Sequence, residues 1–196
     1  MSQAEAAKWE QRYRDGSYSG RAEPSEFIVD WAQRIGPGRA LDLACGRGRH
    51  AIHLARLGFE VDAVDIAAAA LEQGRAAAEA AGVRVNWIRA DLDDFLPAQN
   101  RYRLICVVRY INRDLMRRCA AALAPGGYLL SEQHLRTTRP VEVGPGNPDY
   151  RLPPNDPLSW QLGLRWLDYR EGLVTEADGR TAALTRFAAA KPPLEF

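Results

Sequence analysis

The chain has 196 residues, enough for one domain with a substantial buried core, and its 46% apolar and 26% charged residues are ordinary for a soluble globular protein. A net charge of +1 gives no reason to expect nucleic acid or a membrane surface as a partner, and no apolar run reaches the ~18 residues of a membrane span. The three cysteines are widely spaced and odd in number, and the N-terminus lacks the apolar core of a signal peptide, so neither disulfides nor a metal site is expected and the predicted location is cytoplasmic.

Predicted helices and strands alternate along the chain as far as residue 132. Apolar spacing, glycine stops and candidate caps at Ser25 and Asn112 set their limits. The expected elements are helices over 4–14 and 26–34, a strand over 39–44, a helix over 49–57, a strand over 60–65, a helix over 67–81, a strand over 83–89, an acidic loop or single helical turn over 91–95, a strand over 103–108, a helix over 113–123 and a strand over 128–132. Such alternation predicts an α/β fold with a doubly wound parallel sheet.

The character of the sequence changes after residue 136. Proline and glycine are concentrated in 136–157, which predicts a long irregular loop of the kind that often forms a lid or a binding segment. A short helix over 158–163 and two strands, 164–169 and 182–190, follow, and Asp178-Gly179 between the strands is a hairpin signal. We therefore expect a single domain over 1–196, with a helical lid over 1–36, a cofactor-binding core over 38–132, a substrate-side loop over 136–157 and a C-terminal hairpin over 164–190.

Residues 38–66 have the layout of a nucleotide-binding βαβ unit. The first predicted strand ends in Cys45-Gly46-Arg47-Gly48, a helix follows, and the next strand ends in Asp65. Glycines allow the backbone to approach a ligand closely, a helix N-terminus offers free N–H groups, and an acid in this place can accept from ribose hydroxyls.

The pattern Gly46-x-Gly48-x-x-Ala51 also fits the NAD fingerprint loosely, and three features disfavour that reading. Asp42 lies inside the first strand, where an NAD site normally has an apolar residue. A further acid, Asp91, follows the third strand directly. The chain then ends in a hairpin and has no room for a separate substrate domain.

Four motifs in the same order resemble those of class I S-adenosylmethionine-dependent methyltransferases. They are the first-strand motif 41–48, Asp65, the pair Asp91-Leu92, and the turn into strand five at 124–129. The resemblance implies a Rossmann-like seven-stranded sheet of order 3-2-1-4-5-7-6 with strand seven antiparallel. A looser resemblance is to small stand-alone bacterial methyltransferases of the tellurite-resistance and thiopurine type, and it is carried by Tyr110–Asp114, Gly146–Tyr150 and the ending from Tyr169 to Pro192.

This resemblance implies S-adenosyl-L-methionine as the cofactor. Its methionine part would lie against Gly46 and Gly48, with Ala44 and Cys45 contributing backbone groups. Asp42 would orient the ammonium group or a bridging water, or else be a buried structural acid bonded to loop N–H groups.

The remaining cofactor contacts would come from the ends of the next three strands. Asp65 would take both ribose hydroxyls, and Ile66 would lie against the adenine face or belong to the core. Asp91 would accept from the adenine amino group, and the Leu92 N–H would donate to the ring. Arg109 would face the cofactor carboxylate or the acceptor, or be solvated.

The catalytic candidates are Arg109, Tyr110 and His134, near the carboxyl edge of the predicted sheet. Further residues expected on the acceptor side are Asn112, Glu132, Arg136 and Arg139, and Trp9 or Tyr13 would touch the cofactor if the first helix closes over it.

The expected partner is a small-molecule methyl acceptor, and a sulfur or chalcogen oxyanion would need no strong base. Three alternatives stay open: transfer to nitrogen or oxygen of a metabolite, an NAD(P)-binding oxidoreductase, and a protein that binds the cofactor without catalysis. The sequence does not predict the oligomeric state.

Overall fold

The computed structural model describes residues 3–16 and 22–193. Its elements are the helices α1 (Gln3–Arg14), α2 (Glu26–Ile35), α3 (Arg49–Arg56), α4 (Ala68–Ala80) and α5 (Arg113–Ala122), the strands β1 (Arg39–Leu43), β2 (Glu60–Asp65), β3 (Asn86–Arg89), β4 (Tyr102–Val108), β5 (Leu123–His134), β6 (Arg165–Thr175) and β7 (Thr181–Ala190), and the 3₁₀ turns η1 (Pro148–Tyr150) and η2 (Asp156–Ser159).

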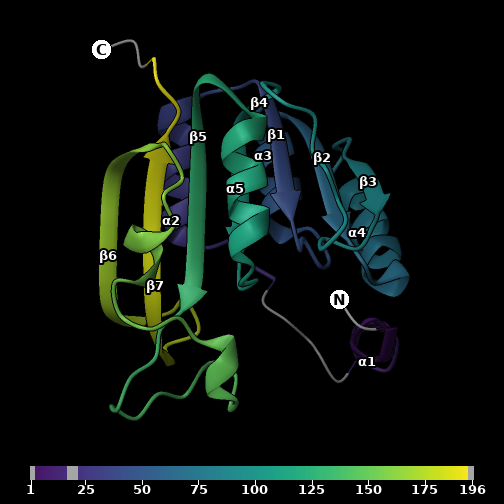
Figure 1. Ribbon diagram of the computed structural model, residues 1–196. Helices are drawn as coiled ribbons and strands as arrows, with labels where there is room; N and C mark the ends of the chain where they lie inside the picture. The colour runs from purple at the N-terminus through teal and green to yellow at the C-terminus, as the bar shows by residue number, and fades with distance from the viewer. Residues whose placement is uncertain (1–2, 17–21, 194–196) are drawn as a thin grey trace.

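All seven strands form one sheet of order β3-β2-β1-β4-β5-β7-β6 (Figure 1), which confirms the predicted topology. β1 to β5 run parallel, and β7 is antiparallel to both β5 and β6. The carboxyl ends of the parallel strands therefore meet at one edge, the lower edge in Figure 1.

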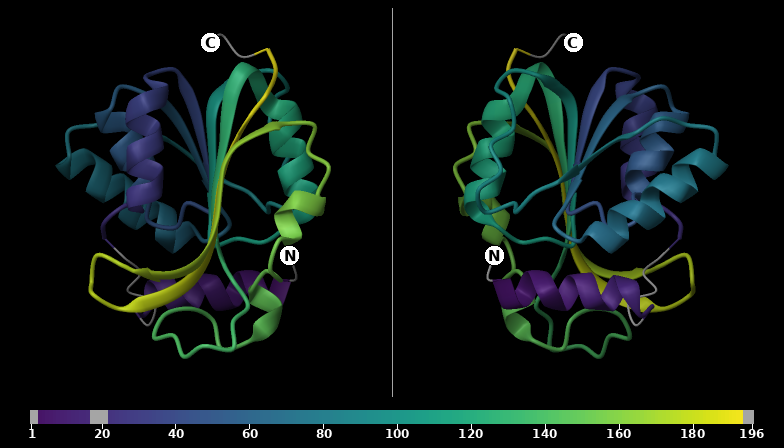
Figure 2. Two further views of the ribbon diagram at one scale, coloured as in Figure 1. Left: turned by 90° about the vertical axis from the view of Figure 1, so that its left-hand side faces the viewer. Right: turned by 90° about the vertical axis from the view of Figure 1, so that its right-hand side faces the viewer.

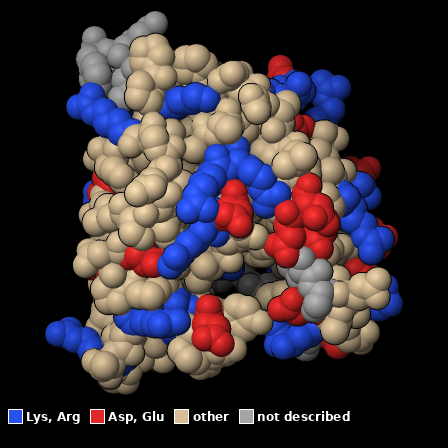
Figure 3. Space-filling model, in the orientation of Figure 1, with Lys and Arg blue, Asp and Glu red and all other residues tan. Residues whose placement is uncertain are grey.

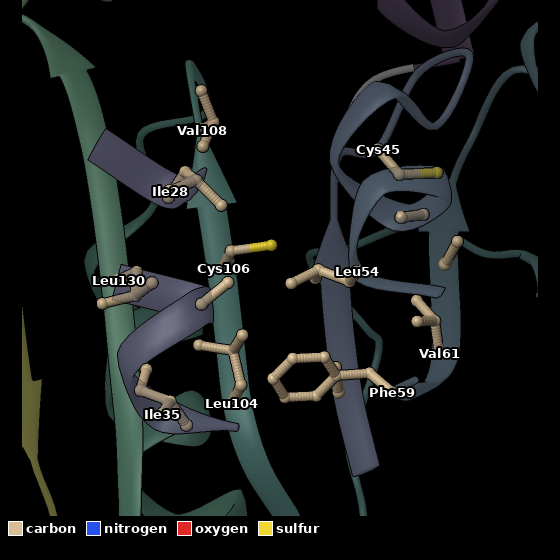
Figure 4. Packing of buried hydrophobic residues seen from close by; sticks show 14 of the residues in the cluster. Ile28, Ile35, Cys45, Leu54, Phe59, Val61, Leu104, Cys106, Val108 and Leu130 are labelled. Atoms are coloured by element: carbon tan, nitrogen blue, oxygen red, sulfur yellow. The ribbon is translucent and has the colours of Figure 1, made fainter. Parts of the chain in front are cut away.

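Two apolar layers bury the sheet. Along β4, Leu104, Cys106 and Val108 pack with α2 and α3 on one face (Figure 4), and Ile105 and Val107 pack with α5 on the other. A strand with apolar side chains on both faces is typical of the centre of a parallel sheet. The continuous apolar run in β4 thus explains its central position.

β5 is longer than the sequence predicted. The expected turn at 124–127 belongs to the strand, because Leu123 already pairs with Tyr102, and the ladder then shifts register before Leu104. Lys191 exchanges backbone hydrogen bonds with Gly126 and Gly127 and fixes this stretch from the other side. The prediction of a turn there was wrong because these pairings come from distant segments.

The C-terminal part also differs in detail. The short helix expected at 158–163 is replaced by η2, where the Trp160 indole N–H donates to Asp156 Oδ2 over 2.9 Å. The hairpin is confirmed, with β6 extended to Thr175.

Asn112 caps α5 as predicted, since its Oδ1 accepts from the Leu115 N–H over 2.8 Å. Asn112→Ala should lower the free energy of unfolding by ~1 kcal/mol, the usual cost of a lost N-cap, measured by urea denaturation. Asn112→Ser keeps an acceptor and should recover most of the loss. Equal losses in both variants would contradict the capping role.

Two segments lie beyond the carboxyl edge of the sheet. α1 crosses below the edge, and the segment after β5 passes beneath it (Figure 2). That segment is held in place because His134 O accepts from the Leu152 N–H over 2.7 Å and Leu152 O accepts from the Arg136 N–H over 2.8 Å. The edge where sites form in such sheets is therefore covered.

The face shown in Figure 3 carries acidic and basic side chains side by side, without a large patch of one sign. Among the described residues, no helix is both long enough and apolar enough to cross a membrane, and no three His, Cys, Asp or Glu side chains are grouped to hold a metal ion.

Candidate functional site

The loop after β1 is a tight turn built on left-handed backbone. Ala44, Gly46 and Gly48 have φ values of 53°, 54° and 74°, and the Gly48 N–H donates to Cys45 O over 2.8 Å. A Cβ on Gly46 would lie 2.5 Å from the Tyr13 hydroxyl. A side chain at Gly46 would be strained at this φ and would displace the phenol of α1, so both the backbone and the packing favour glycine.

Gly48 has a different neighbour. A Cβ there would lie 2.2 Å from the Trp87 ring, and a Cβ on Gly74 of α4 would lie 2.5 Å from the same ring. The two glycines make room for the indole of β3. Gly48 thus fixes the packing of the loop, whereas Gly46 faces α1.

Asp65 ties the end of β2 to the loop and to the start of α4. Its Oδ2 accepts from the Gly46 N–H over 2.7 Å, and its Oδ1 accepts from the Ala67 N–H over 3.0 Å. Burial raises the pKa of Asp65, and these N–H groups oppose the rise. The carboxylate therefore organises the glycine loop directly.

A cavity of about 90 Å³ opens where these elements meet. Its lining residues are Trp9, Tyr13, Ala44, Asp65, Ile66, Leu92, Val108, Arg109 and Tyr110. We call it the edge cavity. It brings together the ends of β1, β2 and β4 with α1, as the sequence predicted for Ala44, Asp65, Ile66, Leu92, Arg109 and Tyr110.

Asp42 lies away from the lining of the edge cavity. Its Oδ2 accepts from the Ala51 N–H over 3.0 Å, and the Cys106 thiol donates to its Oδ1 over 3.3 Å. Burial raises its pKa to about 7. Asp42 therefore holds the first turn of α3. Of the two roles considered from the sequence, this contact corresponds to the buried structural acid.

Cys45 is buried in the loop, with its thiol donating to Gly46 O over 3.6 Å. Burial raises the pKa of this thiol well above its ordinary value. Cys45 is therefore a small, protonated loop residue.

Asp91 and Leu92, which follow β3, have different surroundings. Leu92 lines the edge cavity, whereas the Asp91 carboxylate accepts from the Asp93 N–H over 2.9 Å and shapes the turn after β3. Asp93 in turn accepts from Asn112 Nδ2 over 2.8 Å and from the Tyr110 hydroxyl over 3.3 Å. Burial raises the pKa of Tyr110, so its phenol stays protonated near neutral pH.

Arg109, just past β4, is the centre of a buried charged cluster. Its Nη2 donates to Glu132 Oε1 over 3.1 Å and to Glu176 Oε1 over 2.6 Å, and its Nη1 lies 2.8 Å from His134 Nδ1. The exposed fractions of the Arg109, Glu132 and Glu176 side chains are 16%, 4% and 5%. We call these four residues the Arg109 cluster.

Glu132 links the cluster to α2 and β7. Its Oε2 accepts from the Ser25 hydroxyl over 2.8 Å and lies 3.1 Å from Arg186 Nε. The expected capping of α2 by the Ser25 side chain is therefore wrong, because that hydroxyl is engaged by Glu132.

Glu176 and Arg186 were not among the predicted site residues. Both belong to the β6–β7 part of the chain, and Arg186 reaches Glu132 because the two residues are direct partners in the β5–β7 ladder. No local motif marks either residue, so only the strand register would have revealed them.

The other acceptor-side candidates lie elsewhere. Arg136 Nε donates to the carbonyls of Pro148 and Arg151 and holds the segment after β5. Arg136 and Arg139 line a separate open cavity of about 560 Å³ beside Leu173. The structure thus brings Arg109, Tyr110 and His134 together and leaves these two arginines apart.

Comparison with known proteins agrees with this architecture. Residues 40–127 match the family model described as "Methyltransferase domain". The chain is 41% identical over 83 residues to the release factor glutamine methyltransferase of Bordetella pertussis, covering 41% of this chain and 30% of that protein. It is 25% identical over 146 residues to a ubiquinone biosynthesis O-methyltransferase of Caulobacter sp. (strain K31), covering 70% and 58%. The chain thus spans at most 58% of the length of these curated relatives.

Solved structures show the same fold. TehB from Haemophilus influenzae superposes with a TM-score of 0.73 at 21% identity, over 93% of this chain and 67% of that one. The phosphoethanolamine N-methyltransferase 2 of Haemonchus contortus, solved in complex with S-adenosyl-L-methionine, gives a TM-score of 0.65 at 16% identity, over 85% and 52%. Residues 40–127 thus match a methyltransferase domain, and the sheet order is the one that the resemblance seen in the sequence implied, on a fold shared with these solved structures.

Proposed function

We propose that this protein transfers a methyl group from S-adenosylmethionine to a small molecule, and that the acceptor is a sulfur or chalcogen oxyanion. The observation that carries the proposal is the edge cavity. Asp65, Ile66 and Leu92, which suit an adenosyl group, line the same cavity as Arg109, which suits an anion.

The residues of the edge cavity fit the cofactor chemically. Asp65 supplies a carboxylate for the ribose hydroxyls, and Ile66 and Leu92 supply apolar walls for the adenine. The missing side chain of Gly46 lets the Tyr13 phenol lie against the loop at the wall of this cavity. Asp91 remains the proposed partner of the adenine amino group. When bound, the cofactor supplies an electrophilic methyl group on a cationic sulfur.

What this chain adds is alignment and exclusion of water, because displacement at the methyl carbon needs little else when the acceptor is already an anion. Arg109 would orient such an acceptor. Tyr110 donates a hydrogen bond and stays protonated. His134 lies against Arg109, and we propose it as the proton acceptor if the substrate is neutral. We propose the cytoplasm as the compartment, where the three buried thiols would stay reduced.

Calorimetry with S-adenosylhomocysteine and with NADH tests which cofactor the protein binds. Binding of the first without the second is expected, and the reverse would refute the proposal. A methylation screen over selenite, tellurite, thiols, amines and phenols then decides the acceptor. Transfer to the amines or phenols alone would replace the oxyanion by a nitrogen or oxygen acceptor.

Asp65→Ala should weaken binding of S-adenosylhomocysteine by ~1–3 kcal/mol, about 5- to 150-fold, because it removes an acceptor for the ribose hydroxyls and the anchor of the Gly46 N–H. Asp62→Asn is the matched control. It changes another buried acid of β2, one that accepts from Tyr102 and Asn86 away from the cavity. An unchanged dissociation constant in Asp65→Ala would exclude the proposed role.

A further inference from the structure

A second cavity, of about 340 Å³, lies on the other side of the Arg109 cluster. The residues before and at the start of α2, including Ser25, form one wall. Glu132 of β5 and Arg186 of β7 form another, and the end of β6 with the turn that carries Glu176 forms a third. Arg109 lines the edge cavity, and both of its carboxylate partners line the second cavity. The Arg109 cluster is therefore the partition between the two cavities.

The two carboxylates on Arg109 are held very differently. Glu132 lies inside β5, between strands β4 and β7, and its oxygens also meet Ser25 and Arg186. Glu176 lies in the turn between β6 and β7, where its N–H donates to Arg180 O and its carbonyl accepts from the Gly179 N–H. The residues that follow Glu176 in this turn are exposed, and the hairpin end curves out from the sheet in Figure 2. Glu176 can therefore leave Arg109 if the turn moves, whereas Glu132 is fixed within the sheet.

Together with Arg186, which contacts Glu132, the Arg109 cluster contains two guanidinium groups and two carboxylates in linked ion pairs. Arg109 and Arg186 oppose Glu132 and Glu176, all within linked contacts of 2.6 to 3.1 Å. An additional anion at Arg109 would give this poorly hydrated group a net negative charge, which is unfavourable where the effective dielectric constant is low. An anion that replaced the Glu176 carboxylate would keep the balance and the hydrogen bond from Nη2.

We propose that Glu176 occupies the anion site of Arg109 as an internal substitute for an anionic methyl acceptor, and that the acceptor reaches Arg109 through the second cavity by displacing Glu176. This inference rests on the proposed function and deepens it, because it makes the acceptor an oxyanion or carboxylate that competes with a residue of the protein. Glu176 thereby sets the concentration at which acceptor binds.

The test is calorimetric titration of selenite into the complex with S-adenosylhomocysteine and into the free protein. Glu176→Gln removes the competing charge and keeps the size of the side chain. It should tighten selenite binding by about tenfold or more, because a like charge in contact with the site is lost. Binding of S-adenosylhomocysteine should stay unchanged. Asp178→Asn is the matched control, since Asp178 lines the same cavity on the same turn but pairs with Arg180.

Equal or weaker selenite binding by Glu176→Gln would overturn the proposal, and so would absence of selenite binding in both proteins. Equal tightening by Asp178→Asn would also overturn it, because general charge would then explain the effect. Failure of S-adenosylhomocysteine to bind would count against the proposed function alone. The titration of selenite into the free protein would still test the role of Glu176.

Discussion

Asp42→Asn should remove a large pH-dependent contribution to stability. Burial raises the pKa of Asp42 from 3.8 to about 7, a shift of about three units, and one unit corresponds to ~1.4 kcal/mol. Since the folded-state pKa lies above the unfolded value, Asp42 favours folding least when it is ionised. Its contribution is full below about pH 4 and falls by up to ~4 kcal/mol as the pH rises through 7.

The measurement is the free energy of unfolding in urea at several pH values from 5 to 8, for the wild type and for Asp42→Asn. The difference between the two proteins should shift in favour of the variant as pH rises. The asparagine amide finds only the Cys106 sulfur as a weak acceptor, which adds a loss that does not vary with pH.

His50 is a second titrating group in the same region. Burial lowers its pKa well below 6.5, so its contribution is lost as pH falls. His50 is present in both proteins, and its contribution largely cancels in the difference. A difference independent of pH would show that Asp42 is ionised at all these pH values, contrary to the expectation.

The sequence predicted which residues would meet at the edge cavity because most of them belong to short local motifs. Asp65 follows an apolar strand, and Gly46 belongs to a turn whose spacing is visible in the chain. Parallel strands bring their carboxyl ends to one edge, so placing such residues at strand ends was enough to gather them.

The contacts of the Arg109 cluster depend on relations that a local motif does not contain. Glu176 meets Arg109 only because β6 and β7 pair in one register beside β5, and Arg186 faces Glu132 for the same reason. The start of β5 was misplaced for a related cause, since Gly126 and Gly127 pair with Lys191 near the other end of the chain. Long-range register was the missing information in each case.

The edge cavity is covered by the first helix of the chain. α1 covers it through Tyr13 and Trp9, packed on the alanines Ala67, Ala69 and Ala70. Gln73 Nε2 also donates to Tyr13 O over 2.9 Å, and Glu10 accepts from the Ala69 N–H over 3.3 Å. Of the two N-terminal helices, only α1 lies over the cavity, because α2 packs on β4 within the buried core, so a lid formed by the first helix stays a prediction.

Arg109→Gln should be the most destabilising change in the Arg109 cluster. It removes a guanidinium from Glu132 and Glu176, whose side chains are only 4% and 5% exposed. Removing one partner of a buried ion pair typically costs ~3–5 kcal/mol, since a buried charge is left without its compensation. We expect a loss of that order in urea denaturation at pH 8.

The double variant Arg109→Gln/Glu176→Gln separates this cause from a general packing defect. If the loss comes from uncompensated charge, neutralising Glu176 should restore part of it, so the double variant would be more stable than Arg109→Gln alone. Glu132 would still have Arg186 and Ser25, so Glu132→Gln in the same background should restore less. Strictly additive losses would mean that Arg109 and Glu176 do not interact energetically, and would also remove the basis for treating Glu176 as the occupant of an anion site.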